Sequence, residues 1–95
     1  MMTAPVYQPP PRVDGNNVES FRRTVIQSAT RYGHVVIDCS QVVEMGPSAL
    51  RVLAVAARGA DVVLVNPNQA IRLMAAAYEV RVAMSDERER DRSNA

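Results

Sequence analysis

The side chains able to do chemistry are few in this sequence, and two carboxylates come first. Asp38 and Glu44 flank a predicted loop, where they imitate the acid–base pair of a hydrolase. A hydrolase pocket usually also has a lining of aromatic or polar groups that hold the substrate. Aromatic residues make up only 4% of the 95 residues. We therefore predict that the protein is not an enzyme.

The other reactive side chains stand alone. His34 is the one histidine and Cys39 the one cysteine, and a triad or a metal site would need partners that neither supplies. His34 opens a predicted strand, where we expect a structural or solvated role. Cys39 falls in an apolar run, which predicts a buried thiol. The four glycines, at positions 15, 33, 46 and 59, are isolated and form no phosphate-binding loop, so we expect no cofactor.

The charges of the chain are almost balanced. Eleven arginines and ten acidic residues leave a formal net charge of +1, which gives no general attraction to nucleic acid or to an anionic membrane. Arg22, Arg23 and Arg31 lie on one predicted helix, but no aromatic stacking platform accompanies them. We expect these three arginines to be solvated, and we predict no nucleic-acid partner.

Two observations bear on where the protein resides. Residues 1–11 lack the charged start and the apolar stretch of a signal peptide. No window of the sequence approaches the run of about eighteen apolar residues that a membrane-spanning helix needs. We expect a cytoplasmic protein without direct membrane insertion.

The elements that must position these residues follow from hydrophobic periodicity. Apolar residues at three- and four-residue steps predict helices over 18–32, 48–58 and 71–78, and β-branched runs predict buried strands at 35–37 and 61–65, with a last strand over 80–84. Right-handed crossovers would then place the strands parallel. We predict an α/β fold with a small, mostly parallel β-sheet and about three helices packed on it.

The helix boundaries carry their own signals. Asp14, Asn16 and Asn17 offer side-chain caps for the start of the first helix, and Gly33 offers a left-handed end. Ser48 stands at the start of the second helix, where we expect it to cap.

Both ends of the chain differ from this core. Residues 1–12 contain four prolines and are predicted to be poorly ordered or an edge strand. Residues 13–84 form the single predicted domain. Residues 85–95 are almost wholly charged or polar, so we expect a disordered tail that cannot bury enough apolar surface to order itself.

One stretch carries a family resemblance. From Val35 to Leu50 the chain reads Val-Val-Ile-Asp-Cys-Ser-Gln-Val-Val-Glu-Met-Gly-Pro-Ser-Ala-Leu, and an Ala-rich helix and a Val-Asn-Pro phrase follow. This order resembles the STAS domain of anti-sigma factor antagonists, in which a strand ends in Asp-Leu-Ser and Asp-Ser-Ser-Gly-Leu opens a helix. Asp38 and Ser40 match the first phrase, and Leu50 matches the second.

The resemblance implies a STAS-like fold over roughly residues 12–82. It also assigns two acidic positions of the family to this chain, Asp14 near the phosphorylation loop and Asp38 at the end of a strand.

Two departures from the family pattern affect function. Pro47 occupies the position of the family's phosphoacceptor serine, and proline has no hydroxyl to phosphorylate; Ser48 is the substitute that the sequence offers. The family's opening strands are mostly missing, which predicts an exposed sheet edge able to pair with another chain, including a second copy.

The resemblance implies a non-catalytic interaction module that binds an anti-sigma factor or serine-kinase-like protein, without the usual switch. The expected partner-binding residues are Glu44, Met45, Gly46, Pro47, Ser48 and Arg51. A STAS subunit of an ABC lipid-transport complex, with ABC transporter subunits as partners, is the first alternative, because that role does not require the phosphoacceptor. A small-ligand or nucleotide-binding module is the second.

Overall fold

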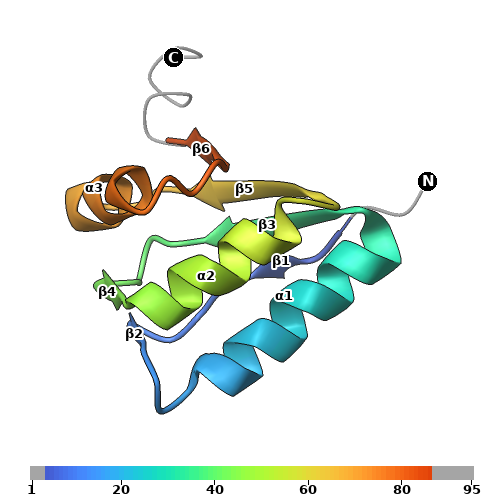
Figure 1. The fold of residues 1–95 in the computed structure, drawn as a ribbon, viewed down its shortest axis with the longest axis horizontal. Coiled ribbons are helices and arrows are strands. Elements are labelled where there is room, and N and C mark those ends of the chain that lie inside the picture. The colour runs from blue at the N-terminus through green and yellow to red at the C-terminus, as the bar shows by residue number, and fades with distance from the viewer. Residues whose placement is uncertain (1–3, 87–95) are drawn as a thin grey trace.

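The computed structural model describes residues 4–86 of the chain. The elements are β1 (Val6–Tyr7), β2 (Arg12–Val13), α1 (Val18–Tyr32), β3 (His34–Asp38), β4 (Glu44–Met45), α2 (Pro47–Ala56), β5 (Asp61–Val65), α3 (Gln69–Ala77) and β6 (Ala83–Ser85), as Figure 1 shows. Three helices and parallel strands confirm the predicted fold class.

Within the described residues the strands form two sheets, and every strand pair in them is parallel. The larger sheet has the order β1-β3-β5-β6, and β2 and β4 form a separate two-stranded ladder. β3 and β5 pair along their whole length, from His34 opposite Asp61 to Asp38 opposite Val65. The loop that leaves β3 therefore emerges at the carboxyl edge of the sheet, beside the start of α2.

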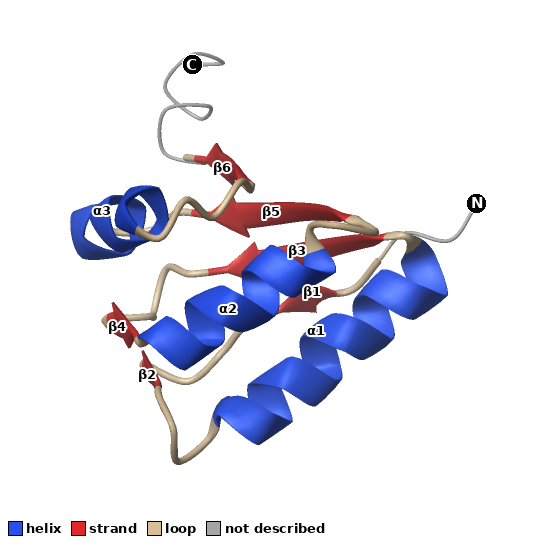
Figure 2. Ribbon diagram, viewed as in Figure 1, coloured by secondary structure: helices blue, strands red, loops and turns tan. Residues whose placement is uncertain are grey.

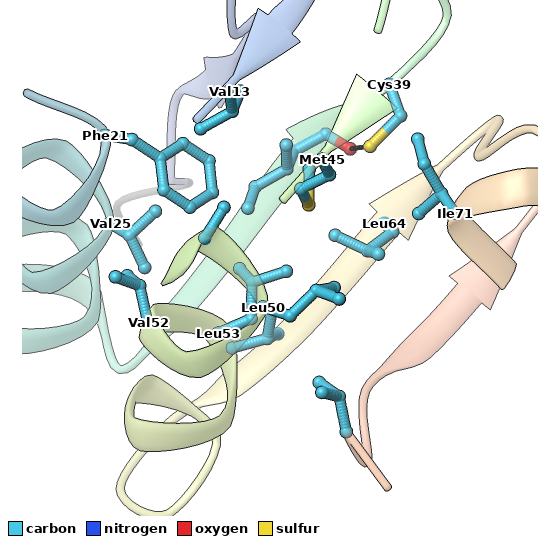
Figure 3. Close-up of a cluster of buried hydrophobic side chains, with 14 of the residues drawn as sticks. Val13, Phe21, Val25, Cys39, Met45, Leu50, Val52, Leu53, Leu64 and Ile71 are labelled. Atoms are coloured by element: carbon cyan, nitrogen blue, oxygen red, sulfur yellow. Dashed lines mark hydrogen bonds between the residues drawn. The ribbon is translucent and has the colours of Figure 1, made fainter. Parts of the chain in front are cut away.

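α1 and α2 cover one face of the larger sheet (Figure 2). Burial alternates along the central strands: Val35, Ile37 and Leu64 are buried, whereas Val36 and Val63 are partly exposed on the other face. The buried face and the helices enclose one apolar core (Figure 3). Its largest side chains include Phe21, Ile37, Leu50, Leu53, Leu64 and Ile71. Full burial of each such side chain contributes about 1.5–3 kcal/mol to folding.

The first helix has its predicted extent, but its start differs in detail. α1 ends at Gly33, which has a φ of 74° and donates its N–H to the carbonyl of Ala29 at 2.9 Å, so the predicted left-handed end is confirmed. Asn17 occupies the N-cap position without capping the helix, because its Oδ1 accepts the N–H of Asp14 at 2.9 Å. The prediction of a side-chain cap at this end was wrong.

The last strand begins later than predicted, because Glu79 and Val80 form the closing turn of α3. Glu79 has a φ of 56°, and Val80 donates its N–H back to the carbonyl of Ala75 at 2.8 Å. Together these form a Schellman motif, in which a left-handed residue lets the chain close the helix. Val80 is buried by this closure, so the predicted start of the strand at Val80 was wrong and β6 begins at Ala83.

The segments outside the predicted core are only partly described. β1 lies within the proline-rich segment and takes an edge position beside β3, while β2 begins at Arg12. Of the predicted tail, Ser85 belongs to β6 and positions 87–95 lie outside the described residues. None of the helices between residues 4 and 86 is long and apolar enough to cross a membrane.

Candidate partner-binding surface

The segment predicted as a partner-binding loop rests on the chain just before α1. The carbonyl of Pro11 accepts the N–H of Val43 at 2.7 Å, and the carbonyl of Val13 accepts the N–H of Gly46 at 2.8 Å. Between these bonds β4 pairs with β2 in parallel, with Met45 opposite Val13. The first half of the predicted loop is therefore a short strand with a fixed backbone.

Exposure divides the predicted contact residues into two groups. The Met45 side chain is buried in the core and cannot touch a partner. Glu44, Pro47 and Arg51 are exposed, and Ser48 is partly exposed. We call these four residues the α2 entry surface, because they surround the first turn of that helix.

The first turn of α2 is built differently from our expectation for Ser48. Gly46 is the N-cap residue, Pro47 follows as the first helical residue, and no side chain caps the helix. Proline suits this position because its fixed φ is helical and its missing N–H would have had no partner. Ser48 is one position further into the helix, so the predicted capping role for it was wrong. Its hydroxyl instead lies on the α2 entry surface.

Asp14 is the acidic residue that the fold brings to this surface. It directly follows β2, and a Cβ on Gly46 would lie 3.8 Å from the Asp14 Cα. The Asp14 carboxylate accepts the N–H of Asn16 at 2.9 Å, which closes the turn into α1. The Asp14 backbone therefore lies beside Gly46, and the turn orients the Asp14 side chain; its role as the family's acidic position stays a prediction.

Asp38 has a different environment at the end of β3. Its carboxylate accepts a hydrogen bond from the side-chain amide of Gln8 at 2.9 Å and from the N–H of Ser40 at 3.0 Å. These bonds favour the charged form, and the pKa of Asp38 is lowered, first by Gln8 and then by Ser40. The carboxylate thus holds the edge strand and the following turn together. Neither of these partners is Glu44, the other carboxylate of the acid–base pair that the sequence resembles.

The surface continues into a hollow between α1 and α2. This hollow, about 220 Å³ in volume, is lined by Arg22, Ile26, Ser48, Arg51, Val52 and Val55. Val55 is an exposed large aliphatic side chain, at 51% exposure. Sequence reasoning missed Ile26 and Val55 as candidate contact residues. The available signal was an arginine followed four residues later by an aliphatic residue, which occurs in both helices.

Asn68 is a second residue that sequence reasoning missed. Its side chain caps α3 by accepting the N–H of Ile71 at 2.8 Å. The same side chain donates to the carbonyls of Val42 and Val43, at 3.2 and 3.1 Å. Asn68 therefore holds the chain just before β4 from the opposite side to Pro11. The Asn-Pro-Asn sequence around Asn68 predicts a turn, but it does not predict the contact of Asn68 with Val42 and Val43.

The lone cysteine and histidine both lie in or beside β3. Cys39 is buried, as predicted, and burial, with the Asp38 charge as a smaller cause, raises its pKa to about 12. His34 is partly exposed at the start of the strand, and its carbonyl accepts the Ser28 hydroxyl at 3.5 Å. Arg22, Arg23 and Arg31 are exposed on α1, as expected.

A second hollow, about 300 Å³ in volume, lies between β1 and α1. Its lining includes Tyr7, Thr24, Ser28, Arg31 and Tyr32. Burial raises the pKa of Tyr7, and a hydrogen bond with Thr24 opposes that rise. The hollow lies at the lower end of the size range of small-ligand pockets. Within residues 4–86 no group of three or more histidine, cysteine or acidic side chains is placed to hold a metal ion.

Comparison with known proteins gives one sequence match and one structural match. A family model described as "Mlab, STAS domain" matches residues 12–84. The fold is similar to that in "Structure of the Anti-Sigma Factor Antagonist SpoIIAA in its Unphosphorylated Form", with a TM-score of 0.64 and 16% sequence identity over 99% of this chain and 94% of that one. No curated protein sequence matches significantly. At this identity the structural likeness shows the shared fold.

Proposed function

Since this chain belongs to the STAS domain family, we propose that it is a non-catalytic interaction module that acts as an anti-sigma factor antagonist. The partner would be an anti-sigma factor of the serine-kinase-like class, and the complex would form in the cytoplasm. The α2 entry surface would be the contact region. The observation that carries this proposal is the exposed group of Glu44, Pro47 and Arg51. The strand β4 that leads into this group is held by its ladder with β2 and by two backbone hydrogen bonds to Pro11, from Val43 and Glu44.

The geometry of the surface supports protein binding in two ways. Its backbone is ordered before any partner arrives, so little conformational entropy is lost on association. It also combines an exposed proline, a serine hydroxyl and the Arg51 guanidinium around a helix start, which gives shape and charge without a deep pocket. A rigid, partly charged patch without a deep pocket suits a protein partner better than a small substrate.

Pro47 makes the proposed antagonist constitutive. Phosphorylation would add about two negative charges at the start of α2 and change docking, but Pro47 offers no hydroxyl at the family's position. Binding would then be set by the amounts of the two proteins.

A binding experiment with charge variants tests this proposal. Purified protein is titrated into candidate anti-sigma factors by calorimetry, with Arg51→Glu as the test variant and Arg58→Glu as the control. Both arginines are exposed, but Arg58 lies beyond the end of α2. The proposal expects micromolar or tighter binding that only Arg51→Glu weakens. Absence of binding to every kinase-like anti-sigma factor, or equal loss in both variants, contradicts it.

Incubation with ATP and the bound partner tests the constitutive character. Intact mass should show no phosphate on the natural chain, whereas Pro47→Ser should acquire one phosphate. A phosphate on Ser48 of the natural chain would show that the switch has moved by one residue, and Ser48→Ala would remove it.

The alternative role, a STAS subunit of an ABC lipid-transport complex, is favoured by the same proline. The resemblance implies that this role needs no phosphoacceptor, so Pro47 is compatible with it. Co-purification of a permease and an ATPase with the tagged protein, in place of an anti-sigma factor, would select this alternative. The hollow beside Tyr7 and Arg31 favours a small ligand as a further possibility, and calorimetry with GTP and ATP tests it directly.

We also propose that two copies of the chain can pair through the edge strand β1. β1 spans two residues, and the prolines at positions 5 and 9 remove hydrogen-bond donors on both sides of it. A shared ladder would therefore be short. Sedimentation of the natural chain and of Val6→Lys measures it, since Val6 is 59% exposed on this strand.

A further inference from the structure

The two helices that cover the sheet run in the same direction. Each connects parallel strands, so each runs opposite to the strands, and Figure 1 shows their starts together near β2 and β4. The positive ends of two helix dipoles therefore lie at one end of the hollow between them.

Each helix presents an arginine and an aliphatic side chain to this hollow. On α1, Arg22 is followed four residues later by Ile26, and on α2, Arg51 is followed four residues later by Val55. Four residues make about one helical turn, or roughly 6 Å along the axis. Because the helices are parallel, the two arginines lie toward the shared helix starts and the two aliphatic side chains lie one turn further along. Val52 forms a buried floor between them.

The two helices that form the hollow carry more basic than acidic side chains, although Asp14 and Glu44 lie near their starts. α1 and α2 contain four arginines and one acidic residue, Glu19. The hollow itself is lined by two arginines and by no acidic side chain. Arg51 has no ion pair among the described residues, while Arg22 forms one with Glu19. Both partners of that pair are more than half exposed, at 53% and 63%, so it contributes little stability and can be exchanged.

We propose that the hollow between α1 and α2 binds an amphipathic helix of the partner protein that carries a carboxylate one turn away from an aliphatic side chain. The carboxylate would lie between Arg22 and Arg51, and the aliphatic side chain would lie between Ile26 and Val55. A helix is the matching element, because its i and i+4 side chains have the spacing that the hollow repeats on both walls. This inference rests on the proposed function and names the part of the partner that extends contact beyond the α2 entry surface.

Glu19 then acts as a built-in competitor. It holds Arg22 in the free protein, and an incoming carboxylate must displace it. Removal of the Glu19 charge should therefore tighten binding, which a merely structural role for this residue would not produce.

The test uses synthetic helical peptides of about 18 residues that share one leucine pattern and carry glutamate, glutamine or lysine one turn before each leucine. They are titrated into the full chain labelled with ¹⁵N. The glutamate peptide should shift the amides around Arg22, Ile26, Arg51 and Val55, the glutamine peptide should bind several-fold more weakly, and the lysine peptide should not bind.

Variants of the chain sharpen the result. We expect Val55→Ser to weaken binding of the glutamate peptide about tenfold, because the peptide would no longer bury the exposed half of an aliphatic side chain. Arg51→Glu should weaken it more than fivefold, and Glu19→Gln should tighten it about two- to threefold. Leu73→Ser is the control: Leu73 is 60% exposed on α3, and its loss should leave binding unchanged.

Three results with the peptides would overturn the inference: equal binding of the lysine and glutamate peptides, amide shifts that map to α3 or to the open sheet face, or no binding up to about 1 mM. Self-association of the chain that Val55→Ser abolishes would also overturn it, because a second copy would then be the occupant of the hollow. The proposed function fails separately. If an anti-sigma factor binds and responds to Arg51→Glu but not to Val55→Ser or Glu19→Gln, the function stands and the helix inference falls.

Discussion

The side-chain amide of Asn68 donates a hydrogen bond to the backbone carbonyl of Val43 at 3.1 Å, although 25 residues separate them. The first residue fixes the start of α3, and the second precedes β4. The candidate surface is thus held on one side by Pro11 and on the other by the cap of a distant helix. Its geometry depends on residues that a partner need never touch.

Substitution of Asn68 should separate the cap from the loop contact. Asn68→Ala loses both, and we expect the free energy of unfolding to fall by about 2 kcal/mol. Asn68→Asp keeps the cap acceptor but replaces the donor to the two carbonyls, so the loss should be about 1 kcal/mol, with faster hydrogen exchange at the Val43 amide. Urea unfolding and hydrogen exchange measure these effects. Gln69→Ala, at an exposed neighbour, is the control, and equal effects in all three variants would contradict the dual role.

Glu79 offers a route to a more stable protein. It is a non-glycine residue with a φ of 56° in the Schellman motif that ends α3, a conformation that costs an L-residue about 1–2 kcal/mol. Glu79→Gly should therefore raise the free energy of unfolding by about 1 kcal/mol, after the entropy of glycine in the unfolded chain is included. Glu79→Ala removes the charge but keeps the strain and should change little. Chemical denaturation of the three proteins decides between strain and charge as the cause.

The Gln8–Asp38 bond should appear in the acid dependence of stability. The pKa of Asp38 is lowered from its ordinary value of 3.8, so the folded state binds protons less readily than the unfolded state does. The stabilisation is present above this ordinary value and is lost as the pH falls through the folded pKa. Gln8→Leu removes the largest cause of the shift. Urea unfolding between about pH 6 and pH 2 should show a gap between the two proteins above pH 4 that closes in acid; a gap that persists at the lowest pH would exclude the bond as its source.

Cys39 should be nearly inert in the folded protein. Burial, with a smaller contribution from the Asp38 charge, raises its pKa from 9.0 to about 12, which lowers the thiolate fraction at neutral pH by a factor on the order of a thousand. Ellman's reagent should label it only as fast as the chain opens, and labelling should accelerate with urea. Rapid labelling of the native protein in buffer would show that the thiol is accessible.

The sequence was most informative where one periodic pattern decides the structure. The apolar spacing that begins at Val18 and the glycine at position 33 predict α1 over its observed length, because burial of one helix face and a left-handed end act locally. The parallel arrangement follows from the alternation of helices and strands and from the handedness of crossovers. The family resemblance supplied the position of the candidate surface.

The parts that sequence reasoning missed depend on contacts between distant segments. β2 and β4 have two residues each, too few for a periodic signal, and they form because Val13 and Met45 are buried together. Val80 is a β-branched residue of the kind that favours strands, yet its N–H bonds to the end of α3 and closes that helix. The hollow between α1 and α2 requires two helix faces to be placed side by side, and each face alone looks like an ordinary solvated surface.

The ladder between β2 and β4 also sets when the candidate surface is assembled. Its two residue pairs join segments that lie on either side of α1 and β3, so during synthesis the surface can form only after that whole unit has left the ribosome and docked. Because Val13 and Met45 are both buried in the core, separation of the ladder would also expose core side chains. We therefore expect the candidate surface to persist on heating until the core around Leu53 and Leu64 is lost with it.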